Sequence, residues 1–189
     1  MFGDKFGHFL DSPLSSLTKR IPLSPNTLTI SGFLITVIAA FILPYYLLLG
    51  GLLILFGGVF DMLDGIVART AGKPSKFGAF LDSVLDRCSD ALLFLAVAWY
   101  FAQRDNYTGT LISLATLIGA FLISYIRARA EGLGESCHIG LMERPERIVF
   151  LAFGAVTGWI LPVMGIMLIL TYFTVIQRFY HVWKGMKQC

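Results

Sequence analysis

The sequence predicts an all-α integral membrane protein with six transmembrane helices and, before them, an amphipathic helix at the membrane interface. Its 189 residues are 56% hydrophobic and only 14% charged, and the mean hydropathy is +0.74. This composition does not fit a water-facing surface and excludes a soluble protein. A transmembrane helix needs about 20 apolar residues, so the length allows about six spans and no separate soluble domain. The net charge of +3 is too small to indicate binding of nucleic acid.

Apolar runs and helix breakers define the elements of this single domain in order. Residues 1–20 repeat Phe and Leu at spacings of three and four, which is typical of a helix lying in the interface plane. A frayed terminus is the alternative. A six-helix bundle is expected over residues 21–189. Its spans cover 27–43, 47–69, 76–101, 108–131, a fifth that begins at Pro145, and a sixth that follows the break at Gly158 and Pro162 and ends near Trp183.

The positions of Lys and Arg predict the orientation of these spans. With the N-terminus inside, all 15 of these residues except Arg104 fall toward one side of the membrane. Basic residues concentrate on the cytoplasmic side of membrane proteins. We therefore expect a multi-pass protein of the cell membrane with both termini in the cytoplasm.

Five aspartates stand in the second and third spans, where charge is costly. An Asp near the centre of a spanning helix costs on the order of 2.5–3.5 kcal/mol on insertion scales, so such residues indicate function. Spacings of three and four place each set on one face of its helix. Counted from the loop that connects the two spans, Asp64 lies at about the depth of Asp82. Asp61 lies at about the depth of Asp86, and both pairs are near the cytoplasmic side. The five are Asp61, Asp64, Asp82, Asp86 and Asp90.

Converging carboxylates in a low-dielectric site need a cation, because like charges and desolvation both oppose their ionisation. Oxygen ligands without His or Cys favour Mg²⁺ or Mn²⁺ over zinc, and four carboxylates have capacity for two ions. We therefore expect two Mg²⁺ ions, replaceable by Mn²⁺, on Asp61, Asp64, Asp82 and Asp86. Structural aspartates that are protonated or paired with an arginine such as Arg87 are the alternative.

A phosphate ligand is expected beside these carboxylates. Arg69 ends the second span, and a guanidinium next to a divalent ion suits a diphosphate. Gly65, Ala68 and Gly78 lie between the two sets of aspartates, and small residues let a ligand come close. Alone, Arg69 would be an ordinary anchor at the membrane interface.

These residues form one signature, Asp61-x-x-Asp64-Gly65-x-x-Ala68-Arg69, eight residues, then Gly78-x-x-x-Asp82-x-x-x-Asp86. It resembles the CDP-alcohol phosphotransferase family at every fixed position. The resemblance implies a homodimer that displaces CMP from a CDP-linked lipid by an alcohol, and it makes Asp86 both a metal ligand and the general base. The CDP site that it implies comprises Asn26, Thr27, Asp61, Asp64, Gly65, Ala68, Arg69, Gly78 and Asp82.

Two of these roles can also be considered on physical grounds. Of the four expected metal ligands, Asp86 is farthest from the loop, and the depth of its carboxylate favours proton transfer with the acceptor hydroxyl. Asn26 or Thr27 could instead be the cap of the first span, an equally good interpretation.

The stretch from 127 to 147 carries more positive charge than orientation requires. Arg144 and Arg147 are three apart at the start of the fifth span, where backbone N–H groups also favour an anion. An acceptor that already carries a phosphate would suit this charge. Pairing of the arginines with Glu131, Glu143 and Glu146 is the alternative. The residues expected to bind the acceptor phosphate are Lys73, Arg127, Arg129, Arg144 and Arg147.

The identity of the acceptor rests on smaller motifs. The segments 86–90, 127–131 and 143–147 resemble the branch of the family that uses inositol phosphate, the phosphatidylinositol-phosphate synthases and their archaeal-lipid counterparts. That branch implies CDP-diacylglycerol or CDP-archaeol as the donor. Glycerol 3-phosphate, which would give phosphatidylglycerol phosphate, is the competing acceptor. An ion-coupled transporter is the alternative class, although the carboxylates lie toward one face and no polar path leads to the other.

Overall fold

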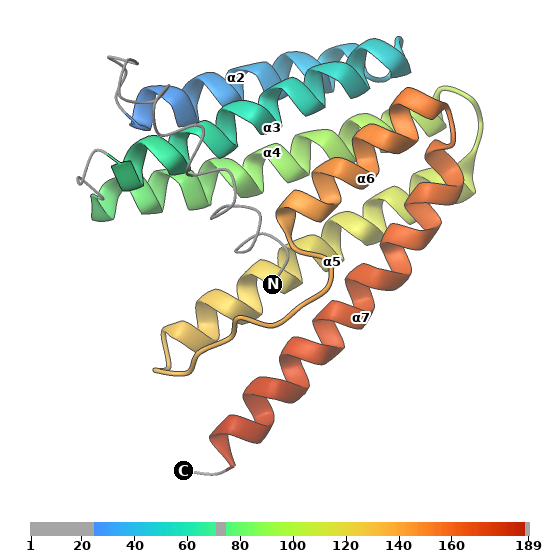
Figure 1. Cartoon of the computed structure of the whole chain (residues 1–189). Helices are drawn as coiled ribbons and strands as arrows, with labels where there is room; N and C mark the ends of the chain where they lie inside the picture. Colours follow the sequence, from blue (N-terminus) through green and yellow to red (C-terminus); the bar gives the residue numbers. More distant parts are fainter. Residues whose placement is uncertain (1–24, 71–74, 188–189) are drawn as a thin grey trace.

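The computed structural model describes residues 25–70 and 75–187, with the backbone alone for 62 and 64–70. These residues form α-helices and no strand (Figure 1). The helices are α2 (Pro25–Ile42), α3 (Leu47–Thr70), α4 (Lys76–Ala102), α5 (Tyr107–Glu131), α6 (Arg144–Thr157) and α7 (Ile160–Met186). The all-α prediction is therefore confirmed. The interfacial helix expected over 1–20 lies outside the described residues.

The helix boundaries follow local capping chemistry. The hydroxyl of Ser75 accepts the N–H of Gly78 at 2.9 Å at the start of α4, and Asn106 Oδ1 accepts the N–H of Gly109 at 2.8 Å at the start of α5. Gly158 ends α6 with a φ of 77°, a left-handed conformation that glycine adopts without strain. Each helix end that the sequence predicted lies within about three residues of its observed position.

The helices contact one another in a closed ring, in the order α2, α3, α6, α7, α5, α4 and back to α2. Apolar side chains from around this ring meet in one core. Leu43, Ile54, Phe94, Leu151 and Met164 are all nearly inaccessible to solvent there. Because lipid tails are as apolar as these side chains, close packing rather than removal from water holds this core together.

Glycines let α3 approach both of its neighbours closely. A Cβ on Gly57 would lie 3.1 Å from Thr36 Oγ1 of α2. A Cβ on Gly51 would lie 2.9 Å from a methyl group of Val156 in α6. Because small residues permit this approach, α3 is held between α2 and α6.

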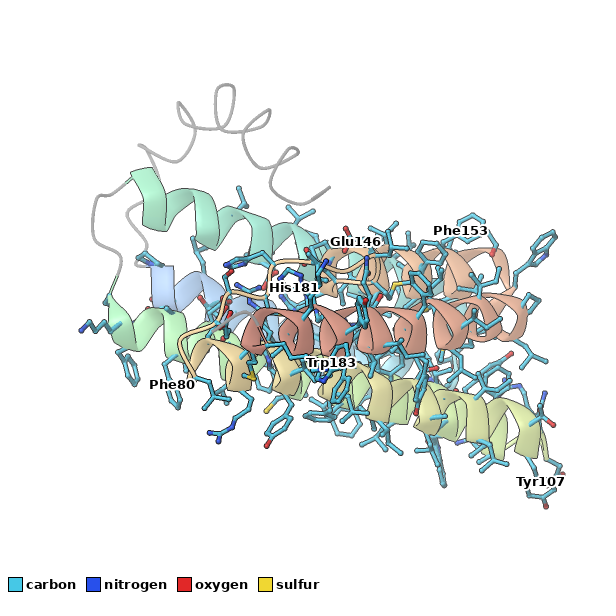
Figure 2. All side chains as sticks on the ribbon, turned by 90° about the horizontal axis from the view of Figure 1, so that it is seen from below. Phe80, Tyr107, Glu146, Phe153, His181 and Trp183 are labelled. Carbon is cyan, nitrogen blue, oxygen red and sulfur yellow. The ribbon has the colours of Figure 1, made fainter. Side chains whose placement is uncertain are left out.

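The outer surface of the bundle is apolar. Figure 2 shows the rings of Phe80, Tyr107 and Phe153 on the outside of the helices, and each is more than half exposed. By length and composition, α2, α5 and α7 can cross a membrane, and α3 contains a shorter apolar stretch, Leu47–Asp61. The 14 residues of α6 rise roughly 21 Å, less than the 30 Å of a hydrocarbon core. These features belong to a membrane protein, and three helices meet the criteria for a full span.

The two ends of the ring differ in chemistry. The short connections after α2, α4 and α6 lie at one end (Figure 1). There Arg104 donates to the carbonyls of Pro44 and Tyr100, and its guanidinium lies 3.8 Å from the centre of the Tyr100 ring. The opposite end brings together the C-terminal part of α3, the first turns of α4 and the start of α6. The candidate site lies there.

Candidate active site

Three of the expected metal ligands converge between α3 and α4. One oxygen atom from each of Asp61, Asp82 and Asp86 lies within 4.8 Å of the other two, and all three residues are half-buried. Asp82 and Asp86 share a face of α4 because they are one turn apart, and Asp61 faces them from α3. We call these three residues the carboxylate cluster.

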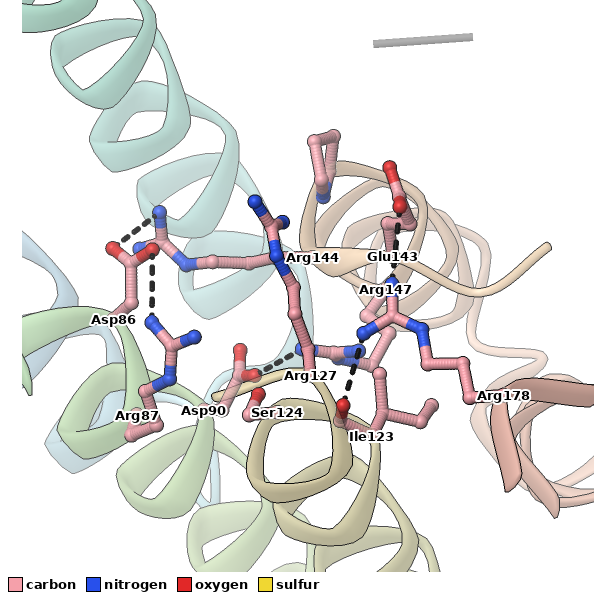
Figure 3. Close-up of a pocket in the computed structure, with 11 residues that line it drawn as sticks. Asp86, Arg87, Asp90, Ile123, Ser124, Arg127, Glu143, Arg144, Arg147 and Arg178 are labelled. Atoms are coloured by element: carbon pink, nitrogen blue, oxygen red, sulfur yellow. Dashed lines mark hydrogen bonds and ion pairs between the residues drawn. The ribbon is translucent and has the colours of Figure 1, made fainter. Parts of the chain in front are cut away.

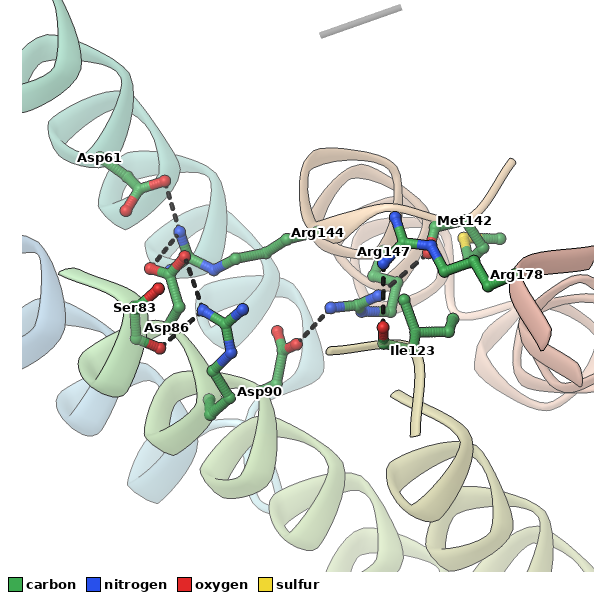
Figure 4. A network of polar contacts seen from close by, with 10 residues as sticks. Asp61, Ser83, Asp86, Asp90, Ile123, Met142, Arg144, Arg147 and Arg178 are labelled. Atoms are coloured by element: carbon green, nitrogen blue, oxygen red, sulfur yellow. Dashed lines mark hydrogen bonds and ion pairs between the residues drawn. The ribbon is translucent and has the colours of Figure 1, made fainter. Parts of the chain in front are cut away.

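Arg144, the first residue of α6, reaches Asp61 and Asp86 of the carboxylate cluster (Figure 4). Its Nη1 lies 2.5 Å from Asp61 Oδ2 and 2.7 Å from Asp86 Oδ1. Its Nε is buried and has no hydrogen-bond partner. One guanidinium therefore bridges α3 and α4, although the sequence placed Arg144 only in an acceptor site.

Arg87 has a weaker link to the carboxylate cluster. Its Nη1 donates to the carbonyl of Ser83 at 2.6 Å and lies 3.8 Å from Asp86 Oδ2. The shortest contact of Arg87 is therefore with a carbonyl of its own helix. The alternative of arginine-paired aspartates applies to Arg144 more than to Arg87.

The carboxylate cluster has the donor chemistry of a divalent-cation site. When ionised, its three members carry three negative charges against the positive charges of Arg144 and, at 3.8 Å from Asp86, Arg87. Unbalanced like charges at this distance are unfavourable away from bulk water. Carboxylate oxygens are hard ligands that suit Mg²⁺ or Mn²⁺, and the residues present therefore fit such an ion.

A basic pocket of about 160 Å³ adjoins the cluster (Figure 3). Five arginines and three carboxylates line it, which leaves an excess of two positive charges when all are ionised. Such a pocket suits a polyatomic anion such as a phosphate group. Asp86 and Arg144 belong to both the carboxylate cluster and the pocket. The pocket is lined by Asp86, Arg87, Asp90, Ile123, Ser124, Arg127, Glu143, Arg144, Pro145, Arg147 and Arg178.

Arg147 is fixed in the pocket wall by a buried ion pair. Its Nη2 lies 2.6 Å from Asp90 Oδ2, and its Nη1 donates to the carbonyl of Met142 at 3.0 Å. The side chains of Arg147 and Asp90 are 4% and 9% exposed. This pair joins α6 to α4 and also holds the end of the connection that precedes α6.

Arg178 of α7 makes three contacts, two with the connection that precedes α6 and one with α5. It donates to the carbonyls of Ile139 at 2.7 Å and Ile123 at 2.9 Å, and its Nη2 lies 3.1 Å from Glu143 Oε1. Sequence reasoning missed this role and counted Arg178 only among the orientation residues. A signal was present: Thr171, Thr174 and Arg178 recur at spacings of three and four on a mainly apolar helix, and all three are buried.

The remaining acceptor residues differ in their positions. Arg127 lines the pocket, and its Nε donates to Glu131 at 2.9 Å. Arg129, two residues further along α5, is exposed and does not line the pocket. Lys73 lies outside the described residues.

Two of the expected CDP residues lie side by side. Asn26 Oδ1 is 2.9 Å from the position that a Cβ on Gly78 would occupy, so the start of α2 touches the first turn of α4. A side chain at Gly78 would displace that amide. Asn26 and Thr27 both stand inside the first turn of α2, so neither is the residue that precedes the helix. The capping interpretation of these two residues is therefore wrong for the observed helix start.

The other expected CDP residues share the C-terminal part of α3. Asp64, Gly65, Ala68 and Arg69 continue the helix that carries Asp61, and for them the structure gives the backbone alone. Helical spacing puts Asp61, Asp64 and Ala68 on one side of α3.

Comparisons with known proteins identify the family of this chain. The family model for CDP-alcohol phosphatidyltransferase matches residues 22–180. The archaetidylinositol phosphate synthase of Methanothermobacter thermautotrophicus is 36% identical over 181 residues, which cover 92% of this chain and 90% of that protein. The phosphatidylinositol phosphate synthase of Mycobacteroides abscessus is 35% identical over 183 residues, with 92% and 83% covered.

Solved structures extend the likeness to the fold. The phosphatidylinositol phosphate synthase of Mycobacterium tuberculosis with CDP-DAG bound superposes with a TM-score of 0.81 at 33% identity, covering 92% of this chain and 93% of that one. The same synthase in complex with manganese and citrate also has a TM-score of 0.81, with 92% and 88% covered. These matches identify a transferase rather than a transporter. Because the family model spans most of its length, the chain belongs to the CDP-alcohol phosphatidyltransferase family.

Proposed function

We propose that the chain transfers the lipid phosphate group of a CDP-linked lipid to inositol phosphate and releases CMP. The observation that carries this proposal is that Asp86 belongs to both the carboxylate cluster and the basic pocket. A base between a metal site and an anion pocket is placed to act on an acceptor whose phosphate lies in that pocket. The names of the relatives in two domains of life support the same acceptor.

Asp61, Asp64, Asp82 and Asp86 would hold two Mg²⁺ ions, with Mn²⁺ able to replace them. When bound, the metal supplies positive charge that screens the diphosphate and stabilises the leaving phosphate of CMP. The manganese complex of a solved relative supports a divalent metal in this fold. The three described carboxylates approach within the range that one ion can bridge.

The CDP group would lie over the start of α4 and the C-terminal part of α3. The contact between Asn26 and Gly78 places a polar amide beside a position without a side chain. Thr27, Gly65, Ala68 and Arg69 complete the proposed CDP site. CDP-diacylglycerol or CDP-archaeol would serve as the donor, since the apolar surface between helices suits either lipid tail. A solved relative contains CDP-DAG.

Asp86 would act as the general base. Its carboxylate faces the pocket from one side of the carboxylate cluster. It would take the proton of the acceptor hydroxyl while that oxygen bonds to the β-phosphorus of the donor and the bond from this phosphorus to the CMP oxygen breaks. Asp86 then carries the proton and CMP leaves with the electron pair.

The basic pocket would bind the phosphate of the acceptor. Arg127, Arg144 and Arg147 face it from two helices, and guanidinium groups make forked contacts with phosphate oxygens. Free inositol or serine carries no phosphate and gives no reason for an excess of positive charge. Glycerol 3-phosphate does carry one and is the competing acceptor.

In the membrane, the six helices would form a six-span bundle in which α6, at roughly 21 Å, is shorter than the hydrocarbon core, with the carboxylate cluster and both termini on the cytoplasmic side. The alternating direction of the helices and the one-sided distribution of Lys and Arg support this orientation. The protein would act as a homodimer, which native mass spectrometry in detergent can test.

The test supplies purified protein with Mg²⁺ and CDP-diacylglycerol, and offers four acceptors in parallel. They are inositol phosphate, glycerol 3-phosphate, free inositol and serine. We expect CMP release with inositol phosphate and none without divalent metal. CMP release with glycerol 3-phosphate alone would overturn the proposed acceptor and leave the family reaction intact.

A further inference from the structure

Arg144 stands on the border between the carboxylate cluster and the basic pocket. Its Nη1 contacts Asp61 and Asp86 at 2.5 and 2.7 Å, and the same side chain lines the pocket (Figure 4). The side chain is 19% exposed, against 4% for Arg147, and its Nε is, like that of Arg147, buried without a partner. An arginine with an unused donor at a cavity is not fully satisfied by the contacts that it makes.

The position of Arg144 conflicts with a divalent cation. Asp61 and Asp86 are two of the three carboxylates that lie close enough to share one ion. A guanidinium within hydrogen-bond distance of both would face that ion at short range, and repulsion between cations is strong where water is scarce. The guanidinium and the ion would therefore compete, through charge repulsion, for the same two carboxylates.

The backbone that carries Arg144 is held in place, so its side chain must do the moving. Three residues further along α6, Arg147 is pinned to Asp90 and to the carbonyl of Met142. Pro145 fixes the backbone of the first turn. With this anchor, the free side of the Arg144 side chain is the basic pocket, where Arg127 also lies.

We infer that Arg144 couples the two sites: a divalent cation on the carboxylate cluster releases its guanidinium into the pocket, where it binds the acceptor phosphate. Arg144 thereby sets the order of binding, with metal and donor before the acceptor. This inference rests on the proposed function, because it assumes a metal on the aspartates and a phosphate in the pocket. Since coupling between two ligands is reciprocal, phosphate must tighten metal binding by the same factor.

Two glutamine variants in detergent test this coupling. The probes are Mn²⁺, followed by the electron paramagnetic resonance of the free ion, and inorganic phosphate, followed by calorimetry with and without Mn²⁺. For Arg144→Gln we expect Mn²⁺ affinity to rise about tenfold, the effect of removing one competing charge-assisted hydrogen bond. We also expect phosphate affinity to become independent of Mn²⁺. Arg127→Gln is the matched control, because Arg127 lines the pocket without contacting an aspartate of the carboxylate cluster: it should weaken phosphate binding, leave Mn²⁺ affinity unchanged and keep the coupling.

Three results would overturn the inference. The first is a lower Mn²⁺ affinity in folded Arg144→Gln, since Arg144 would then support the metal site. The second is coupling that persists in this variant, because phosphate and metal would then be coupled by direct contact and not through Arg144. The third needs no variant: wild-type protein whose phosphate affinity is the same with and without Mn²⁺. Arg144→Lys, which keeps the charge but loses the fork, should raise Mn²⁺ affinity less than Arg144→Gln does, and an equal or larger rise would contradict competition by charge.

The same measurements separate this inference from the proposed function. Mn²⁺ and inorganic phosphate bind or fail to bind whichever alcohol is the natural acceptor. Loss of turnover with inositol phosphate beside intact coupling would refute the acceptor alone. Turnover with inositol phosphate in a wild-type protein without coupling would refute the inference alone.

Discussion

Two arginines one turn apart at the start of α6 lie in different environments. Arg147 forms an ion pair with Asp90 that is almost inaccessible to solvent, and it also holds a backbone carbonyl. Arg144 bridges Asp61 and Asp86 at the edge of a cavity, where its side chain is 19% exposed. Both pairs border the basic pocket, but the pair of Arg147 with Asp90 is nearly inaccessible and joins α6 to α4, whereas the more exposed contacts of Arg144 can be exchanged for a ligand. The comparison separates the structural role of α6 from its functional role, and four experiments address it.

The largest effect is expected on the cavity side, from Asp86→Asn. The amide keeps the shape of the side chain but cannot accept the proton of the acceptor hydroxyl. We expect CMP release to fall by about 10²–10⁴-fold, the usual contribution of a general base. Binding of the CDP-linked lipid, measured by calorimetry, should stay detectable.

A matched control for that substitution lies at the other end of the molecule. Asp105 is exposed and has a φ of 52°, which asparagine also tolerates. Asp105→Asn should keep full turnover. Near-normal turnover in Asp86→Asn would remove this carboxylate from the role of general base.

On the buried side, Asp90→Asn should damage stability more than chemistry. It leaves the guanidinium of Arg147 buried without a counter-charge, which costs about 3–5 kcal/mol of unfolding free energy. The measurement is the unfolding midpoint in detergent. Replacing both partners, in Asp90→Leu with Arg147→Met, should recover most of this loss, because an apolar pair needs no compensation. An unchanged midpoint for Asp90→Asn would show that the pair does not hold α6.

A divalent metal should stabilise the protein only by binding to the carboxylate cluster. A ligand at 100 times its dissociation constant adds about 2.7 kcal/mol to the unfolding free energy. We expect Mg²⁺ to raise the unfolding midpoint of the wild type and a chelator to reverse the rise. Asp61→Asn should lose this response. Asp90→Asn should keep it, although its unfolding midpoint without metal is lower than that of the wild type. Equal responses in both variants would place the metal elsewhere.

The sequence predicted local features of this site better than distant ones. Helical spacing placed Asp82 and Asp86 on one face of α4, and counting from the connecting loop brought Asp61 to a similar depth. Such features depend on residues that are close in the chain. The helix ends were predictable for the same reason, since caps and breakers act over a few residues.

Contacts between distant segments escaped prediction. The bond between Arg144 and Asp61 joins residues that are 83 apart, and the pair of Arg147 with Asp90 spans 57. Periodicity determines which face a side chain occupies, but not which other helix that face meets. The ring order of the helices makes that choice, and it placed Arg144 on the aspartates as well as in the pocket.

The smallest effect expected separates two arginines that the sequence treated alike. Arg127 and Arg129 are two residues apart on α5, and helical geometry turns them in different directions. Arg127 lines the pocket and Arg129 faces outward, exposed. Arg127→Gln should therefore raise the KM for the phosphorylated acceptor about tenfold, the effect of one charge-assisted hydrogen bond, and leave kcat nearly unchanged. Arg129→Gln should change the same KM by about twofold or less, as expected for an exposed charge outside the pocket. Equal rises in both variants would mean that the acceptor binds across the outer face of α5, and the pocket beside Arg144 would lose its assigned ligand.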